Sequence, residues 1–253
     1  MKTLFIGQNA IFLKSVDSTN SYAIELMRQN NLADGSIIYT FEQTKGRGQR
    51  GNEWASEPNK NMALSLVVYP SFLSVMKQFL LAKITAIAIA DFMAELLCIP
   101  EKNGRIQIKW PNDIYIDDKK IAGILIENTI RDANIQSSVI GVGINVNQID
   151  FNPTLNATSM KRIAEQEFDL NLIVARFCSF FESRYLQLIA NKLATIDREY
   201  LEKLYRLNKW NQFSSKNDIF KGRIKGVTEF GKLQLELESA EIREYDLKEI
   251  GFT

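Results

Sequence analysis

Residues 42–54 form a glycine- and arginine-rich segment that constrains the fold more than any other part of the sequence. Glycine permits positive φ angles and lets a backbone approach a ligand closely, and arginine offers a rigid fork of donors that matches phosphate or carboxylate. The glycines are Gly46, Gly48 and Gly51, the arginines are Arg47 and Arg50, and Trp54 closes the segment. The pattern predicts either an anion-binding loop beside an aromatic surface or a flexible surface loop with solvated charges, and alone it does not decide between them.

Two common nucleotide-binding folds do not fit this segment. Residues 46–51 match G-x-G-x-x-G, but the dinucleotide fingerprint needs a preceding strand and a helix that opens within the motif. Residues 36–41 predict the strand, whereas residues 52–61 are polar, contain Pro58 and lack a helical period. A P-loop is excluded as well, because no Gly-Lys-Ser/Thr sequence closes the segment.

The composition narrows the chemistry that the chain can perform. Its 253 residues suit one large domain or one domain with a small appendage, and 45% hydrophobic residues suit a soluble globular core. Lys and Arg number 31 and Asp and Glu number 30, so the net charge of +1 does not point to nucleic acid or membrane. The sequence contains no histidine, which excludes Ser-His-Asp and Cys-His nucleophile systems and histidine-based zinc sites.

The cysteines and the apolar segments favour a cytoplasmic protein. Cys98 and Cys178 form neither a CxxC motif nor a disulfide framework, and both fall in apolar stretches that predict helices with buried free thiols. No apolar region with a small-residue cleavage site, as in a signal peptide, is visible. The most apolar run, residues 79–97, is interrupted by charged side chains and therefore predicts a buried helix rather than a membrane span.

Hydrophobic periodicity and turn residues predict mixed α and β structure. Strands are expected at 11–14, 36–42, 61–69, 105–109, 114–117, 121–127 and 138–147, and helices at 22–28, 75–98, 170–193 and 196–207. After Asn208 the pattern changes to short β-like segments separated by turns. We therefore expect one large domain over 1–207 and a small β domain over 208–253.

Polar residues at the ends of these elements have local explanations. Asp17, Ser18 and Thr19 favour an N-cap role, which is compatible with a ligand bound at the same helix N-terminus. Lys109 ends a strand and faces away from its isoleucine neighbours, where a solvated surface lysine is the commoner outcome. Asp113 could orient a cation, but a turn cap is favoured.

The strand predicted at 138–147 contains two interior glycines, Gly141 and Gly143. Glycine inside a strand often marks the close approach of a ligand or of another backbone. A β-bulge explains one such glycine more easily than two. Asn145 and Asn147 share a strand face with both glycines, since side chains alternate along a strand.

Four motifs appear in order along the chain. They are Asp-Ser-Thr-Asn at 17–20, Gly-Arg-Gly-Gln-Arg-Gly-Asn-Glu-Trp at 46–54, Lys-Trp-Pro-Asn-Asp at 109–113 with Lys-Ile-Ala-Gly-Ile-Leu-Ile-Glu at 120–127, and Gly-Val-Gly-Ile-Asn-Val-Asn at 141–147. Together they resemble the biotin protein ligases over about residues 11–150, and the β-rich tail is similar to the SH3-like C-terminal domain of that family. The resemblance implies an α+β fold in which a mixed β-sheet is backed by helices, related to class II aminoacyl-tRNA synthetase cores.

The resemblance also implies an ATP-dependent ligase that works in two steps. The carboxylate of biotin attacks the α-phosphate of ATP with Mg²⁺ present, which gives biotinyl-5′-AMP and pyrophosphate. A lysine of a biotin carboxyl carrier protein or domain then attacks the mixed anhydride, which gives biotinyl-lysine and AMP. Neither step needs histidine or a covalent enzyme nucleophile, because the chemistry rests on alignment and charge stabilisation.

Individual roles follow from the same resemblance. Lys109 and Arg47 match the catalytic cations, and Arg50, Trp54 and Asn145 match the ATP or adenylate side. The residues that match the biotin site are Ser18, Thr19, Asn20, Gln43, Arg47, Gly48, Gln49 and Lys109. The family more often has arginine where this chain has Gln49, so the phosphate contact is expected from Arg47, Arg50 or Lys109.

Several alternatives stay open at this point. A lipoate ligase or octanoyltransferase has a similar fold, but the loop at 46–51 together with 109–113 fits the biotin enzymes better. A sensor that binds biotin or a nucleotide without turnover would release no pyrophosphate. A DNA-binding regulator is disfavoured by the net charge and by the start of the Ser-Thr-Asn motif at residue 18, which leaves no room for an N-terminal helix-turn-helix.

The sequence does not identify ligands for Mg²⁺ and does not decide whether the chain forms a homodimer. For the group that deprotonates the acceptor lysine, Asp113 and Glu127 are the candidates.

Overall fold

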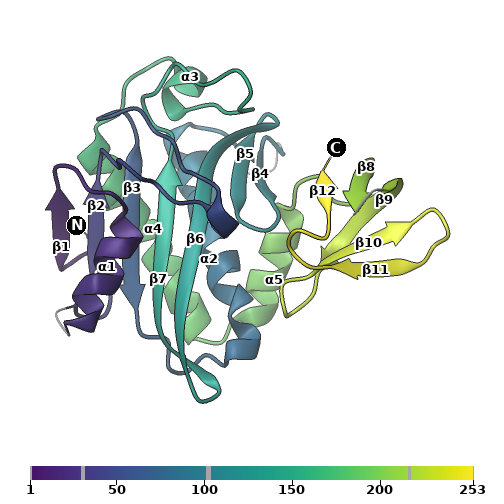
Figure 1. The fold of residues 1–253 in the computed structure, drawn as a ribbon, viewed down its shortest axis with the longest axis horizontal. Coiled ribbons are helices and arrows are strands. Elements are labelled where there is room, and N and C mark those ends of the chain that lie inside the picture. The colour runs from purple at the N-terminus through teal and green to yellow at the C-terminus, as the bar shows by residue number, and fades with distance from the viewer. Residues whose placement is uncertain (1, 30–31, 101–103, 216–217, 253) are drawn as a thin grey trace.

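A seven-stranded sheet forms the centre of the computed structural model, which describes residues 2–29, 32–100, 104–215 and 218–252. The strand order is β1-β2-β3-β7-β6-β5-β4 (Figure 1). The strands are β1 (Ala10–Leu13), β2 (Ile37–Thr40), β3 (Met62–Val68), β4 (Ile106–Lys109), β5 (Asp113–Ile116), β6 (Lys119–Arg131) and β7 (Asn134–Ile144), and the α-helices are α1 (Thr19–Arg28), α2 (Phe79–Leu96), α3 (Met160–Ala164), α4 (Leu170–Ile189) and α5 (Leu193–Glu202). Strands β1 and β2 pair in parallel and the other neighbours pair antiparallel. The predicted mixed sheet is confirmed.

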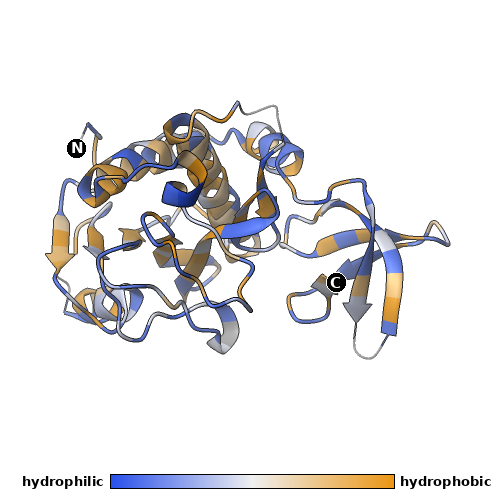
Figure 2. Cartoon of the chain, turned by 90° about the horizontal axis from the view of Figure 1, so that it is seen from above, coloured by the Kyte–Doolittle hydropathy of each residue, from blue (hydrophilic) through white to orange (hydrophobic). Residues whose placement is uncertain are grey.

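The two faces of this sheet carry different layers. On β3, Leu64 and Leu66 belong to the main hydrophobic core together with residues of α2 and α4. Val67, between Leu66 and Val68, belongs instead to a smaller cluster with Ala23 of α1. Because successive strand residues point to opposite faces, α1 lies on one face and the long helices lie on the other (Figure 1). In Figure 2 hydrophobic colour appears on strands and helices of the larger part and also on strands of the small sheet.

Helix α2 is largely buried although it carries Lys83 and Asp91. Lys83 Nζ lies 2.7 Å from Asp197 Oδ1 on α5, and Asp91 pairs with Arg184 on α4. Buried charges need such partners, because an unpaired ion in a low-dielectric interior is costly. The buried helix predicted over 79–97 is confirmed, and within the described ranges no helix combines the length and apolar character needed to cross a membrane.

Helices α4 and α5 end earlier than their apolar patterns predict. Helix α4 ends at Ile189 and α5 at Glu202. The helix expected over 196–207 is cut short because the carbonyl of Lys203 accepts a hydrogen bond from the backbone N–H of Ile108 on β4, at 2.8 Å. Periodicity identifies the residues that face the core, whereas this contact with an edge strand decides where the helix stops.

A second, five-stranded antiparallel sheet follows in the order β11-β10-β9-β8-β12. Its strands are β8 (Trp210–Ser215), β9 (Asp218–Val227), β10 (Leu233–Leu237), β11 (Ile242–Tyr245) and β12 (Gly251–Phe252). The sheet lies at one side of the larger part, beside α5 (Figure 1). Across this contact the indole Nε1 of Trp110 donates to the carbonyl of Gly231 at 2.9 Å. The β character predicted after Asn208 is confirmed.

The two cysteines have different surroundings. Cys178 on α4 is buried, and burial raises the pKa of its thiol to about 12, so the thiol stays protonated at neutral pH. Cys98, directly after α2, is exposed. The prediction of two buried thiols is therefore wrong for Cys98, where a positive φ of 51° turns the chain away from the helix.

A buried carboxylate holds the N-terminal segment. Glu182 on α4 is 6% exposed and accepts hydrogen bonds from the backbone N–H groups of Leu4, Phe5 and Ile6 at 2.8, 2.8 and 3.0 Å. Leu4 bonds to one carboxylate oxygen, and Phe5 and Ile6 bond to the other. Because hydrogen bonds to an ionised acceptor are stronger than neutral ones, Glu182 fixes the segment that leads into β1.

We predict that Glu182→Gln lowers the free energy of unfolding by about 1–3 kcal/mol, because the amide leaves at least one of these buried N–H groups without an acceptor. Denaturant unfolding followed by circular dichroism measures the change. Glu202→Gln is the matched control, since this side chain is 66% exposed and its arginine partner lies 3.9 Å away. Equal stability of the two variants would contradict the role given to Glu182.

Candidate functional site

A cavity of about 470 Å³ opens between the N-terminus of α1, the 43–54 loop and strands β6 and β7. This volume lies in the usual range of ligand sites in proteins. Leu247 and Lys248, between the last two strands of the second sheet, complete its wall. The predicted site residues that line it are Ser18, Thr19, Asn20, Gln43, Arg47, Gly48, Gln49 and Trp54.

Three glycines leave the floor of the cavity without side chains. Gly123 on β6 is directly opposite Gly143 on β7, and Gly141 lies two residues before Gly143 on the same face. A Cβ atom at Gly143 would lie 2.5 Å from Cε2 of Trp54, and one at Gly141 would clash with the amide of Asn20. The close approach predicted for these glycines is therefore made by two side chains of the protein itself.

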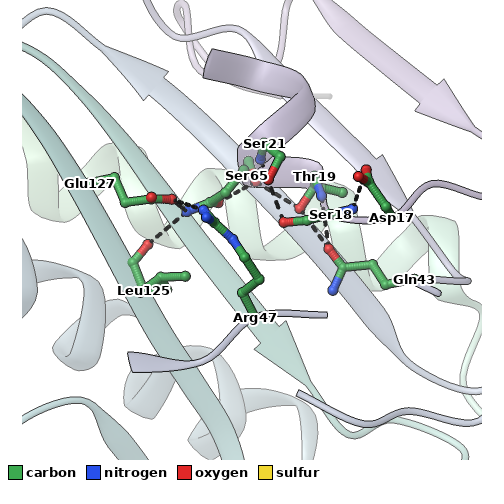
Figure 3. Close-up of polar contacts among 10 residues, drawn as sticks. Asp17, Ser18, Thr19, Ser21, Gln43, Arg47, Ser65, Leu125 and Glu127 are labelled. Atoms are coloured by element: carbon green, nitrogen blue, oxygen red, sulfur yellow. Dashed lines mark hydrogen bonds and ion pairs between the residues drawn. The ribbon is translucent and has the colours of Figure 1, made fainter. Parts of the chain in front are cut away.

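The N-terminus of α1 points its first residues at the cavity (Figure 3). Ser18 is the N-cap, its Oγ accepting from the backbone N–H of Ser21, and Asp17 accepts from the N–H of Ser18 at 2.7 Å. The predicted cap is thus confirmed for Ser18. Gln43 Oε1 accepts from the backbone N–H of Thr19 at 2.9 Å, so the chain before the Gly/Arg loop is attached directly to the helix start.

Ser65 on β3 is a site residue that the sequence analysis missed. Its Oγ is buried and lies 2.7 Å from Thr19 Oγ1 and 2.6 Å from Asn20 Oδ1 (Figure 3). The Ser65 hydroxyl on strand β3 therefore fixes the orientation of the Thr19 and Asn20 side chains. A signal existed, because Ser65 is a polar residue inside the otherwise apolar segment 62–68.

An ion pair closes one side of the cavity. Arg47 Nη2 lies 2.5 Å from Glu127 Oε2, and the same oxygen accepts from Asn20 Nδ2 at 2.8 Å (Figure 3). Both charged side chains are partly exposed, at 43% and 31%. Glu127, on β6, thus connects the Gly/Arg loop to the helix start, while water and ligands still have access to the arginine.

Trp54 lies against the glycine floor. Its six-membered ring is the part nearest to Gly123 and Gly143, and Lys120 Nζ lies 5.7 Å from the centre of the indole. The loop that carries Trp54 folds back on itself, since Trp54 N–H donates to the carbonyl of Gly46 at 3.0 Å. The buried indole Nε1 finds no hydrogen-bond partner among the residues that the structure describes.

Lys120 begins the 120–127 motif, but the sequence analysis gave this residue no role of its own. It lines the cavity at the start of β6, with Nζ 2.7 Å from Asp113 Oδ1 on β5. Asp113 was predicted to cap a turn or orient a cation, and the structure has it paired with this cation. The signal was the sequence 119–123, where a second lysine precedes the glycine of the floor.

Lys109, predicted as a catalytic cation, does not line the cavity. It ends the edge strand β4, and its Nζ donates to Tyr115 Oη at 3.1 Å. Burial lowers the pKa of Lys109, while the nearby Asp113 opposes that change. The structure thus brings Lys120, and not Lys109, to the cavity.

Two further predicted residues are not seen lining the cavity. Asn145 is buried and donates from Nδ2 to the carbonyl of Thr158 at 3.0 Å, so it holds the chain before α3 and does not reach the cavity. For Arg50 the structure describes the backbone, in the short 3₁₀ turn Gln49–Gly51, and its side chain lies outside the described part.

Comparison with known proteins identifies the family of the chain. The sequence model of the biotin/lipoate A/B protein ligase family matches residues 12–145, more than half of the chain. The chain belongs to this family.

Individual members are similar over much of their length. The chain is 31% identical over 242 residues to the bifunctional ligase/repressor BirA of Bacillus subtilis, covering 93% of this chain and 72% of that protein. It is 35% identical over 134 residues to a biotin–[acetyl-CoA-carboxylase] ligase of Paracoccus denitrificans, 53% of each. A structure of the biotin protein ligase of Aquifex aeolicus in complex with biotin and ATP has the same fold, with a TM-score of 0.79 at 23% identity over 97% of this chain and 99% of that one.

We predict that Gly143→Ala displaces Trp54 from the floor, because the new Cβ would lie within 2.5–2.9 Å of three indole atoms. The indole N–H resonance of Trp54 in a ¹⁵N-labelled sample should shift. Gly226→Ala is the matched control, since a Cβ at this other strand glycine meets its nearest atom at 3.5 Å. An unchanged Trp54 resonance in Gly143→Ala would show that the indole does not lie on the floor in solution.

Proposed function

We propose that this protein is an ATP-dependent biotin protein ligase. The observation that carries the proposal is the cavity, in which the Gly/Arg loop, two cations and the polar start of α1 surround a floor without side chains. Sequence similarity to ligases whose names specify biotin supports the choice of acid. One carboxylate oxygen of biotin forms a bond to the α-phosphorus of ATP, the bond from that phosphorus to the bridging oxygen breaks, and pyrophosphate leaves.

Charge stabilisation of this step is assigned to Lys120 and Arg47. Each cation is held at the cavity by a carboxylate, Lys120 by Asp113 at 2.7 Å and Arg47 by Glu127 at 2.5 Å. Donors that are in position before the substrate binds stabilise developing charge without reorganising during the reaction. We propose Lys120 as the catalytic lysine, in the role that the sequence analysis gave to Lys109.

The biotin head is assigned to the polar groups at the start of α1. A ureido ring needs neutral donors and acceptors at fixed positions, and Ser18, Thr19, Asn20 and Gln43 offer hydroxyl and amide groups there. Ser65 orients Thr19 and Asn20 from below. This arrangement supports binding of a neutral polar ring, while the carboxylate end of the same acid extends toward Lys120.

The adenylate is assigned to the end of the cavity near Trp54. The indole offers an aromatic face, and Gly48 and Gln49 supply backbone and amide groups on the same wall. Lys248 contributes a further cation from the second sheet. The contact predicted for Arg50 stays a prediction, and Asn145 acts through the segment that it holds in place.

Mg²⁺ fits this site as an ion carried by the nucleotide. Within the described residues no group of three or more acidic, cysteine or histidine side chains is arranged to hold a metal, and the cavity wall supplies the separate carboxylates of Glu53 and Asp113. Mg²⁺ at phosphate sites is commonly held by one or two carboxylates and by phosphate oxygens. When bound, it would neutralise charge on the leaving pyrophosphate.

The acceptor is proposed to be a lysine of a biotin carboxyl carrier protein or domain, in the cytoplasm. Its amine nitrogen bonds to the acyl carbon, AMP leaves, and the nitrogen loses a proton. Asp113 and Glu127 are the carboxylates near this path, and both are in ion pairs. We propose that one of these two carboxylates takes the proton from the acceptor amine.

Incubation of the purified protein with ATP, Mg²⁺ and one of biotin, lipoate or octanoate tests the proposal. Pyrophosphate release and acyl-AMP detected by mass spectrometry give the acid that is activated, and a biotinylated carrier lysine gives the transfer. We expect biotinyl-AMP. Formation of lipoyl- or octanoyl-AMP would be consistent with the family but would contradict biotin as the substrate. Binding of biotin without release of pyrophosphate would indicate a sensor.

We predict that Lys120→Met slows acyl-adenylate formation by about 10²–10³-fold, the usual cost of removing one preorganised donor of this kind. Lys119→Met is the matched control, because the preceding lysine of the same strand is exposed and does not line the cavity. Single-turnover pyrophosphate release measures both variants. Equal rates for Lys119→Met and Lys120→Met would refute the assignment of Lys120.

A further inference from the structure

Lys109 lies in an aromatic cluster between the two sheets. Its Nζ is 4.8 Å from the ring centre of Tyr115 on β5 and 5.0 Å from that of Phe252 on β12, and it donates to Tyr115 Oη. Tyr205 closes the cluster, with its ring centre 5.4 Å from Tyr115 and 6.4 Å from Phe252. A cation near aromatic faces is attracted to them, more strongly where water is partly removed. Lys109 therefore connects the edge of the large sheet to the last strand of the small one.

The neighbouring residue makes a second contact with the small sheet. Trp110 is 4% exposed and donates from Nε1 to the carbonyl of Gly231, between β9 and β10. A Cβ at Gly231 would lie 2.7 Å from Phe79 at the start of α2, so the turn between β9 and β10 packs tightly against this helix. Lys109 and Trp110 thus contact the small sheet at two separate points, one on β12 and one in the turn before β10.

The strand that Lys109 holds is connected to the cavity by a short turn. Phe252 pairs with Phe213 of β8, and Leu247 forms a parallel bridge with Ile250. The N–H of Glu249 donates to the carbonyl of Asp246 at 3.0 Å, which closes the turn around Lys248. Lys248 lines the cavity with a φ of 78°, a left-handed conformation that a non-glycine residue keeps when its surroundings enforce it.

We propose that Lys109 is a positioning residue that sets the place of Lys248. Its ammonium holds Phe252, Phe252 holds the 246–250 turn, and the turn presents Lys248 to the phosphate groups of the bound nucleotide. This inference rests on the proposed function for its substrate, and it assigns Lys109 no contact with biotin. Loss of the ammonium weakens the nucleotide site and leaves the biotin site at the start of α1 intact.

The test compares Lys109→Met, Phe252→Leu, the double variant and Lys248→Met. We expect KM for ATP to rise about tenfold in Lys109→Met, the effect of one partly desolvated cation–π contact, and the Kd of biotin by calorimetry to change less than about twofold. The double variant is expected to be no worse than Lys109→Met, because both changes break the same contact. Lys109→Arg keeps a cation and should recover most of the affinity for ATP.

Lys221→Met is the matched control. Lys221 also lies over an aromatic ring, that of Trp210 at 5.9 Å, but its side chain is 54% exposed and does not line the cavity. It should leave both constants unchanged. A weaker biotin affinity in Lys109→Met would overturn the proposal in favour of direct contact with the acid. A lower melting temperature with unchanged KM for ATP would also overturn it and leave a purely structural role.

A readout that needs no catalysis separates this inference from the proposed function. Hydrogen exchange of the amides at 245–252 should be faster in Lys109→Met than in wild type or Lys221→Met. If wild type forms no acyl-adenylate but this difference is found, the proposed function fails and the contact between Lys109 and the turn stands. Unchanged exchange at 245–252 would overturn the contact itself.

Discussion

The site depends on a sheet surface from which side chains are missing. Gly123, Gly141 and Gly143 lie side by side on two central, paired strands, so the sheet backbone forms the floor of the cavity. Trp54 and Asn20 approach this floor more closely than a Cβ would allow. Strand glycines weaken a sheet, and here β6 and β7 offset that weakness by pairing along most of their length. A side chain on any of the three would move a residue of the site.

Charge at the site is organised by pairing and not by an excess of basic residues. The net charge is +1, yet three cations line the cavity. Two of them, Arg47 and Lys120, each contact a carboxylate of their own. Partly exposed pairs of this kind contribute little to stability. These ion pairs hold Arg47 and Lys120 in fixed positions, so a polyanionic ligand meets cations that are already oriented. The ligand then competes with the two carboxylates for these cations.

Local patterns in the sequence predicted most of the strands and helices, and the resemblance to the biotin protein ligases implied the mixed sheet and the predicted site residues, of which eight line the cavity. Glycines in a strand, a helix cap and an arginine loop each have a short-range signature, and their order along the chain indicated the family. The structure places Lys120 and not Lys109 at the cavity. Lys109 and Lys120 lie in strands on either side of β5, and sequence alone does not give the contacts around each. The contact of Phe252 with Lys109 joins residues 143 positions apart (252 − 109), and no periodicity signals such a pair. The same holds for Lys248, which reaches the cavity through the packing of the small sheet.

Which lysine touches the reacting phosphate is the central question, and a crystal structure of the protein with biotinyl-AMP formed in place answers it most directly. We predict that the acyl phosphate lies within hydrogen-bonding distance of Lys120 Nζ, above the glycine floor, with Lys109 still against Phe252. An acyl phosphate bound by Lys109, with Lys120 kept on Asp113 and away from the ligand, would contradict it.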